Sequence, residues 1–63
     1  MNNTPVQLIG LPLDEARAYI NKHLDYEEVR YLHKDSLISA ESQMGRLNVY
    51  FDNFGLVDFV SEG

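Results

Sequence analysis

Twelve residues without a regular hydrophobic period, Lys34 to Gly45, separate two segments that have the pattern of β-strands. An antiparallel pair of strands can be joined by a few residues, whereas a parallel pair needs a crossover of about a dozen or more. The two strands are therefore expected to be parallel. Segments of this length without secondary structure are uncommon in compact domains and often carry function. A crossover with no further role is the alternative.

Alternating side chains mark the two flanking strands. The first spans Val29 to His33 and the second spans Leu47 to Phe51, and in each of them every second residue points the same way. On the second strand Leu47, Val49 and Phe51 share one face. Residues 52–55 then read as a turn, in which Gly55 or Asn53 can take a positive φ. Residues 56–60 are expected to return as the second strand of a hairpin.

A helix is expected before the strands, at about residues 12–23. Pro12 stands where a helix would start, and Asp14 and Glu15 follow in the first turn, where carboxylates suit the positive helix end. Apolar residues recur at helical spacing: Leu13, Ala16, Tyr19 or Ile20, and Leu24. The predicted fold class is α+β, with one helix on a small mixed sheet that combines a parallel pair with a C-terminal antiparallel hairpin. Residues 1–63 form one domain, of which residues 1–5 are expected to be flexible.

The aromatic residues divide into core and surface candidates. Tyr19, Phe51 and Phe59 are predicted to be in the core. Tyr50 and Phe54 are the candidates for exposure, which would indicate an interface.

The charge balance bears on partners. Ten acidic against five basic residues give a formal charge of −5, which disfavours nucleic acid, because phosphate contacts need a basic face. No apolar run is long enough for a membrane span. The chain has no cysteine and no visible secretory signal, so a cytoplasmic location is expected, or a secreted or periplasmic one if a signal had been removed.

Catalysis and metal binding find no support in the sequence. His33, Asp35 and Ser36 have the residue types of a catalytic triad, but they are sequence neighbours and no nucleophile elbow is present. His23 and His33 do not have metal-ligand spacing. The protein is therefore expected not to be an enzyme and to need no cofactor.

Several short motifs, taken in order, resemble the potato inhibitor I family of serine protease inhibitors. The first half of the chain contributes Leu8-Ile9-Gly10, Glu15-Ala16, Ile20 and Val29-Arg30. The second half contributes Arg46-Leu47-Asn48-Val49, Asp52, Gly55 and Gly63, which is similar to the bacterial and fungal branch of that family. The resemblance covers residues 8–63.

The resemblance implies a long exposed loop that enters a serine protease like a substrate. The reactive loop would comprise Leu37, Ile38, Ser39, Ala40, Glu41 and Ser42. The scissile bond would join Ala40 to Glu41, and the small side chain of Ala40 would suit subtilisin-like or elastase-like enzymes. Arg46 would support the loop by bonding to Ser39, Glu41 or both, with Asn48 two residues further on. A solvated charge at the start of a strand is the alternative account of Arg46.

The sequence departs from the family pattern at the ends of this loop. His33-Lys34-Asp35 stands where the family commonly has a Pro-Gly pair, and Ser42-Gln43 replaces an aromatic and a basic residue. Gly45 stands where Asp is common, and it is expected to add freedom at the loop's exit. Glu62 stands where the family has a closing cysteine.

Two other functions remain open from the sequence. One is an intracellular binding module, monomeric or a small homo-oligomer, that sequesters a small anionic ligand through Arg30, Lys34 and Arg46 or blocks a host protein. The other is a purely structural accessory domain.

Overall fold

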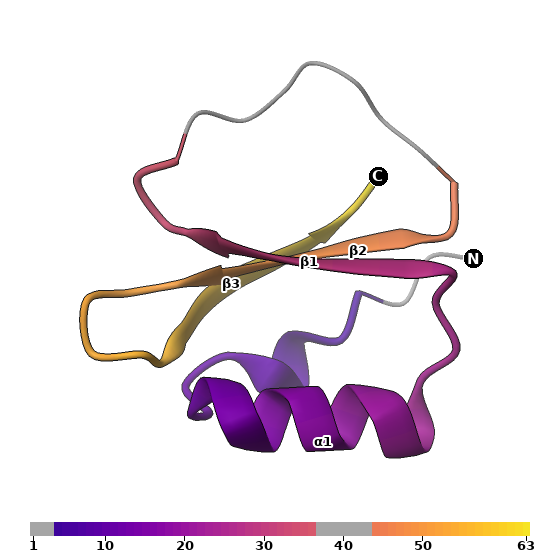
Figure 1. Ribbon diagram of the computed structural model, residues 1–63, viewed down its shortest axis with the longest axis horizontal. Coiled ribbons are helices and arrows are strands. Elements are labelled where there is room, and N and C mark those ends of the chain that lie inside the picture. The colour runs from indigo at the N-terminus through magenta and orange to yellow at the C-terminus, as the bar shows by residue number, and fades with distance from the viewer. Residues whose placement is uncertain (1–3, 37–43) are drawn as a thin grey trace.

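One helix lies across one face of a three-stranded sheet in the computed structural model, which describes residues 4–36 and 44–63 (Figure 1). The elements are the 3-10 helix η1 (Val6–Leu8), the helix α1 (Leu13–His23) and the strands β1 (Glu28–His33), β2 (Arg46–Phe51) and β3 (Val57–Glu62). The strand order is β1-β2-β3, with β1 parallel and β3 antiparallel to β2. The predicted α+β class and the parallel first pair are confirmed.

The helix begins one residue later than expected. Pro12 is extended, with ψ 149°, and pairs with Leu56 instead of joining the first turn. The N–H of Leu13 donates to the carbonyl of Gly55 at 3.0 Å, so the helix start is bonded to the segment before β3. The helix ends after His23, where Leu24 turns extended.

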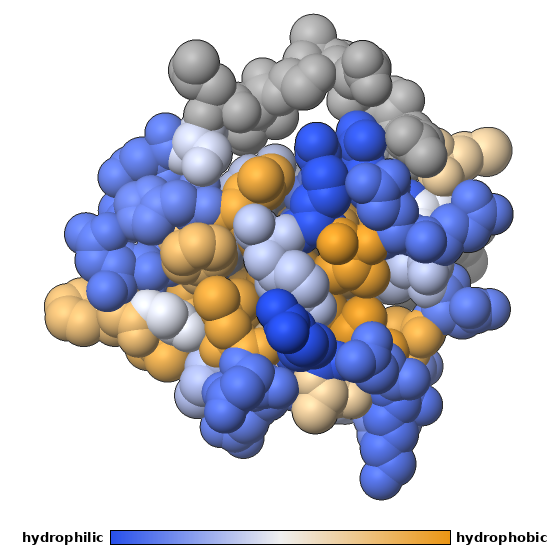
Figure 2. All heavy atoms as spheres, in the orientation of Figure 1, coloured by the Kyte–Doolittle hydropathy of each residue, from blue (hydrophilic) through white to orange (hydrophobic). Residues whose placement is uncertain are grey.

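The core lies between α1 and the sheet. Its members are the buried residues Leu8, Ala16, Ile20, Leu47, Val49, Val57 and Val60. Figure 2 shows hydrophobic residues gathered in the middle of the view, between the helix and the sheet, with hydrophilic residues on much of the rim. Leu47 and Val49 of the central strand therefore face the helix, as their alternation predicts.

Two predictions about aromatic residues are wrong. Phe59 is 53% exposed, whereas Tyr50 is buried at 4%. A β-bulge between Tyr50 and Phe51 makes both Val57 and Val60 face the helix, which turns Phe59 to the opposite side of the sheet. There Phe59 pairs with Tyr50 on the central strand, with ring centroids 6.0 Å apart.

Of the other three aromatic candidates, one is exposed and two are half-buried. Tyr19 packs at the margin of the core. Phe51, which the sequence predicts to be in the core, is only half-buried and lies outside the core cluster, with its ring nearly perpendicular to that of His33. Phe54 is exposed, as expected for a residue in a turn.

The turn between β2 and β3 is built around Asp52. One carboxylate oxygen of Asp52 accepts the N–H groups of Phe54 at 2.8 Å and Leu56 at 3.0 Å. Gly55 takes the positive φ of 78°, and Asn53 does not. Strand β3 runs to Glu62, two residues beyond the expected end, because the pairing with β2 continues to Leu47 opposite Glu62.

Within the described residues, no helix is long and apolar enough to cross a membrane. The same residues contain no group of three His, Cys, Asp or Glu side chains placed to hold a metal ion.

Candidate functional site

The face of the sheet opposite α1 carries three of the predicted site residues, Arg30, Arg46 and Asn48. The strand register places on this outer face Glu28, Arg30, Leu32, Arg46, Asn48, Tyr50, Phe59 and Ser61. The Arg46 and Asn48 side chains are each only 5% exposed. The outer face thus holds buried polar groups, which need hydrogen-bond partners.

Asn48 stands at the centre of a polar network. Its side-chain oxygen accepts from Arg30 Nε at 3.0 Å. Its Nδ2 donates to the Gly63 carbonyl at 3.0 Å and to the Ser61 hydroxyl oxygen at 3.5 Å. One amide side chain on the central strand therefore ties all three strands together.

Arg46 belongs to the same network. Its Nε donates to the carbonyl of Gly63 at 3.0 Å, and the N–H of Gly63 donates to the Arg46 carbonyl at 2.9 Å. The interpretation of Arg46 as a solvated charge is wrong, because the side chain is buried. A buried guanidinium with a fixed set of donors is suited to holding neighbouring backbone in one position.

The predicted reactive-loop residues Leu37, Ile38, Ser39, Ala40, Glu41 and Ser42 lie outside the described residues. A bond from Arg46 to Ser39, to Glu41 or to both therefore stays a prediction. The structure describes the two ends of the 34–45 segment, which are Lys34 to Ser36 and Met44 to Gly45.

The first end is held against the β2–β3 hairpin. The N–H of Lys34 donates to the carbonyl of Phe51 at 2.8 Å, and the N–H of Ser36 donates to the carbonyl of His33 at 2.9 Å. His33 Nε2 lies 2.6 Å from the side-chain oxygen of Asn53 in the turn. The sequence did not predict that Asn53 contacts His33, because the two are twenty residues apart and only the sheet register brings them together.

The second end is held by Gly45. Its carbonyl accepts the N–H groups of Glu27 at 2.9 Å and Glu28 at 3.3 Å, next to the start of β1. Its φ is 80°, which L residues other than glycine seldom adopt. The sequence predicts added freedom at Gly45, but in the structure this residue is fixed by two hydrogen bonds and needs to be glycine.

We expect Gly45→Ala to lower the free energy of unfolding by about 1–2 kcal/mol, because the left-handed conformation is costly for alanine. A Cβ at this position would also lie 3.3 Å from two side-chain carbons of Glu27. Gly10→Ala is the matched control, since its φ is 93° and a Cβ there meets nothing within 4 Å. Urea unfolding should show a loss for both variants and a larger loss for Gly45→Ala. A Gly45→Ala variant as stable as the parent would contradict this.

The alternative ligand contacts are only partly brought together. Arg30 and Arg46 share the outer face and are linked through Asn48 and the Gly63 carbonyl. Lys34 lies four residues beyond Arg30, about 13 Å away along an extended chain. The Nε atoms of both arginines donate to groups of the protein itself. This arrangement favours a structural role for the two arginines over the binding of an anion.

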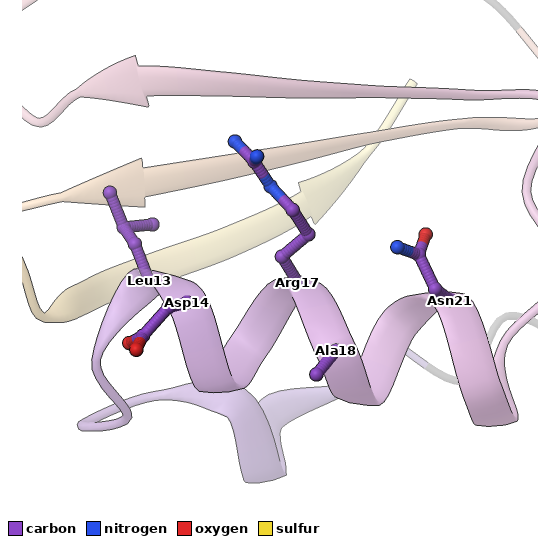
Figure 3. A pocket seen from close by; sticks show the side chains of 5 residues that line it. All are labelled: Leu13, Asp14, Arg17, Ala18 and Asn21. Carbon is purple, nitrogen blue, oxygen red and sulfur yellow. The ribbon is translucent and has the colours of Figure 1, made fainter.

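A hollow of about 490 Å³ lies on the helix side, away from the outer face. Figure 3 shows Leu13, Arg17 and Asn21 pointing from α1 toward the strands, while Asp14 and Ala18 point away. The Arg17 guanidinium lies 5.0 Å from the centre of the Tyr31 ring. This contact joins the helix to β1, and the hollow has no part in the outer-face network.

Tyr26 and Glu62 form a contact on the helix side of the sheet, where Glu62 pairs with Leu47, and the Tyr26 hydroxyl donates to the Glu62 carboxylate at 2.8 Å. Partial burial, then the hydrogen bond and negative charge of Glu62, raise the pKa of Tyr26 from 10.0 to about 12. As the pH rises, the Tyr26 hydroxyl therefore loses its proton at a lower pH in the unfolded chain than in the folded protein.

We expect the free energy of unfolding to fall between about pH 10 and pH 12 through this group, because only the unfolded state has ionised Tyr26 there. Below pH 10 the hydroxyl is protonated in both states and adds no slope. The measurement is urea unfolding of the parent and of Tyr26→Phe across this range, which cancels the other titrating groups. A constant difference between the two proteins would refute the expectation.

The described residues thus define a small α+β domain with a single helix on a mixed three-stranded sheet and a buried polar network on the opposite face. A solved structure of the elastase inhibitor AFUEI, in its crystal form II, is similar to this chain with a TM-score of 0.70. The two are 26% identical, and the match covers 90% of this chain and 79% of that one. No protein-family model and no curated protein matches the sequence.

Proposed function

We propose that the protein is a serine protease inhibitor that acts like a substrate and presents the bond between Ala40 and Glu41. The observation that carries this proposal is the similarity to an elastase inhibitor over 90% of the chain. The protein would act by binding and not by catalysis. Its target would be a subtilisin-like or elastase-like enzyme, in keeping with the small side chain of Ala40.

The described contacts support this proposal at both ends of the 34–45 segment. Three backbone carbonyls, of His33, Phe51 and Gly45, accept the hydrogen bonds that fix these ends. Buried Arg46 lies at the start of β2, where the resemblance requires a loop-supporting arginine. Such fixing favours tight binding, because less conformational entropy is lost when the segment enters the protease. The Ala40 methyl itself would contribute only on the order of 1 kcal/mol.

The test is inhibition of elastase and of subtilisin by the parent and by Ala40→Asp. We expect inhibition by the parent and a loss of at least about a hundredfold in Ala40→Asp, because a carboxylate would be buried without a partner in an apolar pocket. Asn21→Asp on α1 adds the same charge outside the segment and should inhibit like the parent. The proposal fails if neither enzyme is inhibited at micromolar concentration and the chain is quickly cut after Ala40.

The anion-binding alternative has less support, since Arg30 and Arg46 are engaged with Asn48 and Gly63. Equilibrium dialysis with inorganic phosphate would detect it.

A further inference from the structure

We propose that His33 is a positioning residue whose neutral imidazole fastens the start of the 34–45 segment to the β2–β3 turn, and that protonation of the ring weakens inhibition. The inference rests on the proposed function, because it concerns how that segment is held. Two contacts of the ring, with Asn53 and with the backbone of Asp35, form what we call the His33 bridge.

The geometry selects one protonation state of the ring. The backbone N–H of Asp35 points at His33 Nδ1 over 3.1 Å, so Nδ1 must be the acceptor. The ring proton is then on Nε2, which donates to the Asn53 side-chain oxygen at 2.6 Å. Only the neutral imidazole with its proton on Nε2 makes both hydrogen bonds.

The far side of the bridge is rigid. Asn53 belongs to the turn that the Asp52 carboxylate holds through the N–H groups of Phe54 and Leu56. The imidazole also packs against the ring of Phe51, with the two rings nearly perpendicular and their centroids 5.6 Å apart. The His33 bridge therefore transfers the position of a fixed turn to the backbone of Asp35, where the 34–45 segment leaves the sheet.

Protonation of the ring would turn Nδ1 from a hydrogen-bond acceptor into a donor. A proton there would face the N–H of Asp35, and two donors cannot share a bond. The Asp35 carboxylate, whose Oδ2 lies 3.8 Å from Nδ1, would attract the charged ring instead. The ring would exchange a backbone partner for a side-chain partner, and the backbone at Asp35 would have to move.

Titratable and charged groups are present on each element that neighbours His33. Lys34 and Asp35 belong to the segment itself, and Asp52 belongs to the turn. On the helix side, Tyr31 precedes His33 on the same face of β1, and Arg17 of α1 lies over Tyr31. The side chain of His33 is 33% exposed, so water reaches it. Histidine is the side chain whose charge ordinarily changes between about pH 8 and pH 5, and this general property sets the two pH values of the experiment.

The experiment compares inhibition constants of the parent, His33→Gln and His23→Gln for elastase and subtilisin at pH 8 and pH 5.5. Dividing the inhibition constant of each protein by that of His33→Gln at the same pH cancels the pH dependence of the protease. We expect the advantage of the parent over His33→Gln to shrink about five- to tenfold at the lower pH, which is the loss of one hydrogen bond. His23→Gln changes the chain's only other histidine and should follow the parent.

Asn53→Ala is the second variant, because it breaks the bridge and leaves the titrating ring in place. It should inhibit less well than the parent at pH 8. A ratio of parent to His33→Gln that is the same at both pH values would overturn the inference.

A second readout needs no protease. In the parent, the NMR shift of the Asp35 backbone amide should follow the titration of the His33 ring, and in His23→Gln it should do the same. If no protease is inhibited, the proposed function fails, and the NMR measurement alone decides the His33 bridge. A chemical shift of the Asp35 amide that changes with the protonation of His33 supports the bridge, and a shift that stays constant overturns it.

Discussion

The Leu47→Ala variant is expected to lose about 2–5 kcal/mol of unfolding free energy, the range for emptying a fully buried leucine site. Leu47 is 0% exposed and lies in the central strand, against the core residues of α1. At about 0.05–0.15 kcal/mol per residue, a domain of this length has roughly 3–9 kcal/mol in total. The variant should therefore be partly unfolded at room temperature, as circular dichroism and urea titration would show.

Phe59→Ala is the matched control for this prediction. It removes a larger side chain from the same sheet, but from the outer face, where Phe59 is half-exposed. We expect a loss of at most about 1 kcal/mol, mostly from the ring contact with Tyr50. Equal losses in the two variants would mean that the side of the sheet that forms the core has been assigned wrongly.

The Arg46→Met variant is expected to lose about 1–3 kcal/mol of unfolding free energy and a larger share of any inhibition. Methionine keeps an apolar stem, but it removes the Nε donor to the Gly63 carbonyl in a buried position. If Arg46 also holds the 34–45 segment, as the resemblance implies, inhibition should weaken by at least about tenfold. Urea unfolding and inhibition constants, measured where the variant is fully folded, separate the two effects.

Arg30→Met is the control for Arg46. Arg30 lies on the same face and donates through Nε to Asn48 at 3.0 Å, but it is only half-buried. Arg30→Met should lower the free energy of unfolding by less than Arg46→Met does, and it should leave the inhibition constants nearly unchanged. Equal inhibition by the Arg46→Met variant and the parent would remove Arg46 from the support of the segment, whatever its effect on stability.

Much of the fold could be predicted because it follows from local patterns. Helical spacing of Ala16 and Ile20 and alternation of Leu47 and Val49 each identify a buried face without knowledge of the partner. The parallel pairing of β1 and β2 follows from the length of the 34–45 segment alone. The site could be predicted only in part: the resemblance to a known family named Arg46 and Asn48, and the structure places both in one buried network.

The errors share one physical cause. Phe59 looked like a core residue because it is large and apolar, but the β-bulge turns it away from the helix. Tyr50 has a side chain that is common at surfaces, yet in the central strand it lies between Leu32 of β1 and Phe59 of β3 and is only 4% exposed. In each case, contacts made by other strands override the preference of the side chain itself.

The twelve residues between the strands, by their number and lack of period, predict a parallel crossover, and the helical spacing of the residues before them predicts the one helix of the α+β domain. The spacing of apolar residues and the length of a segment can both be read directly from a sequence. The tertiary structure decided that Arg46 is buried, that Gly45 is fixed in a left-handed conformation, and that His33 meets Asn53 across twenty residues. These facts depend on strand register and on a bulge, which are settled only when all three strands pair at once.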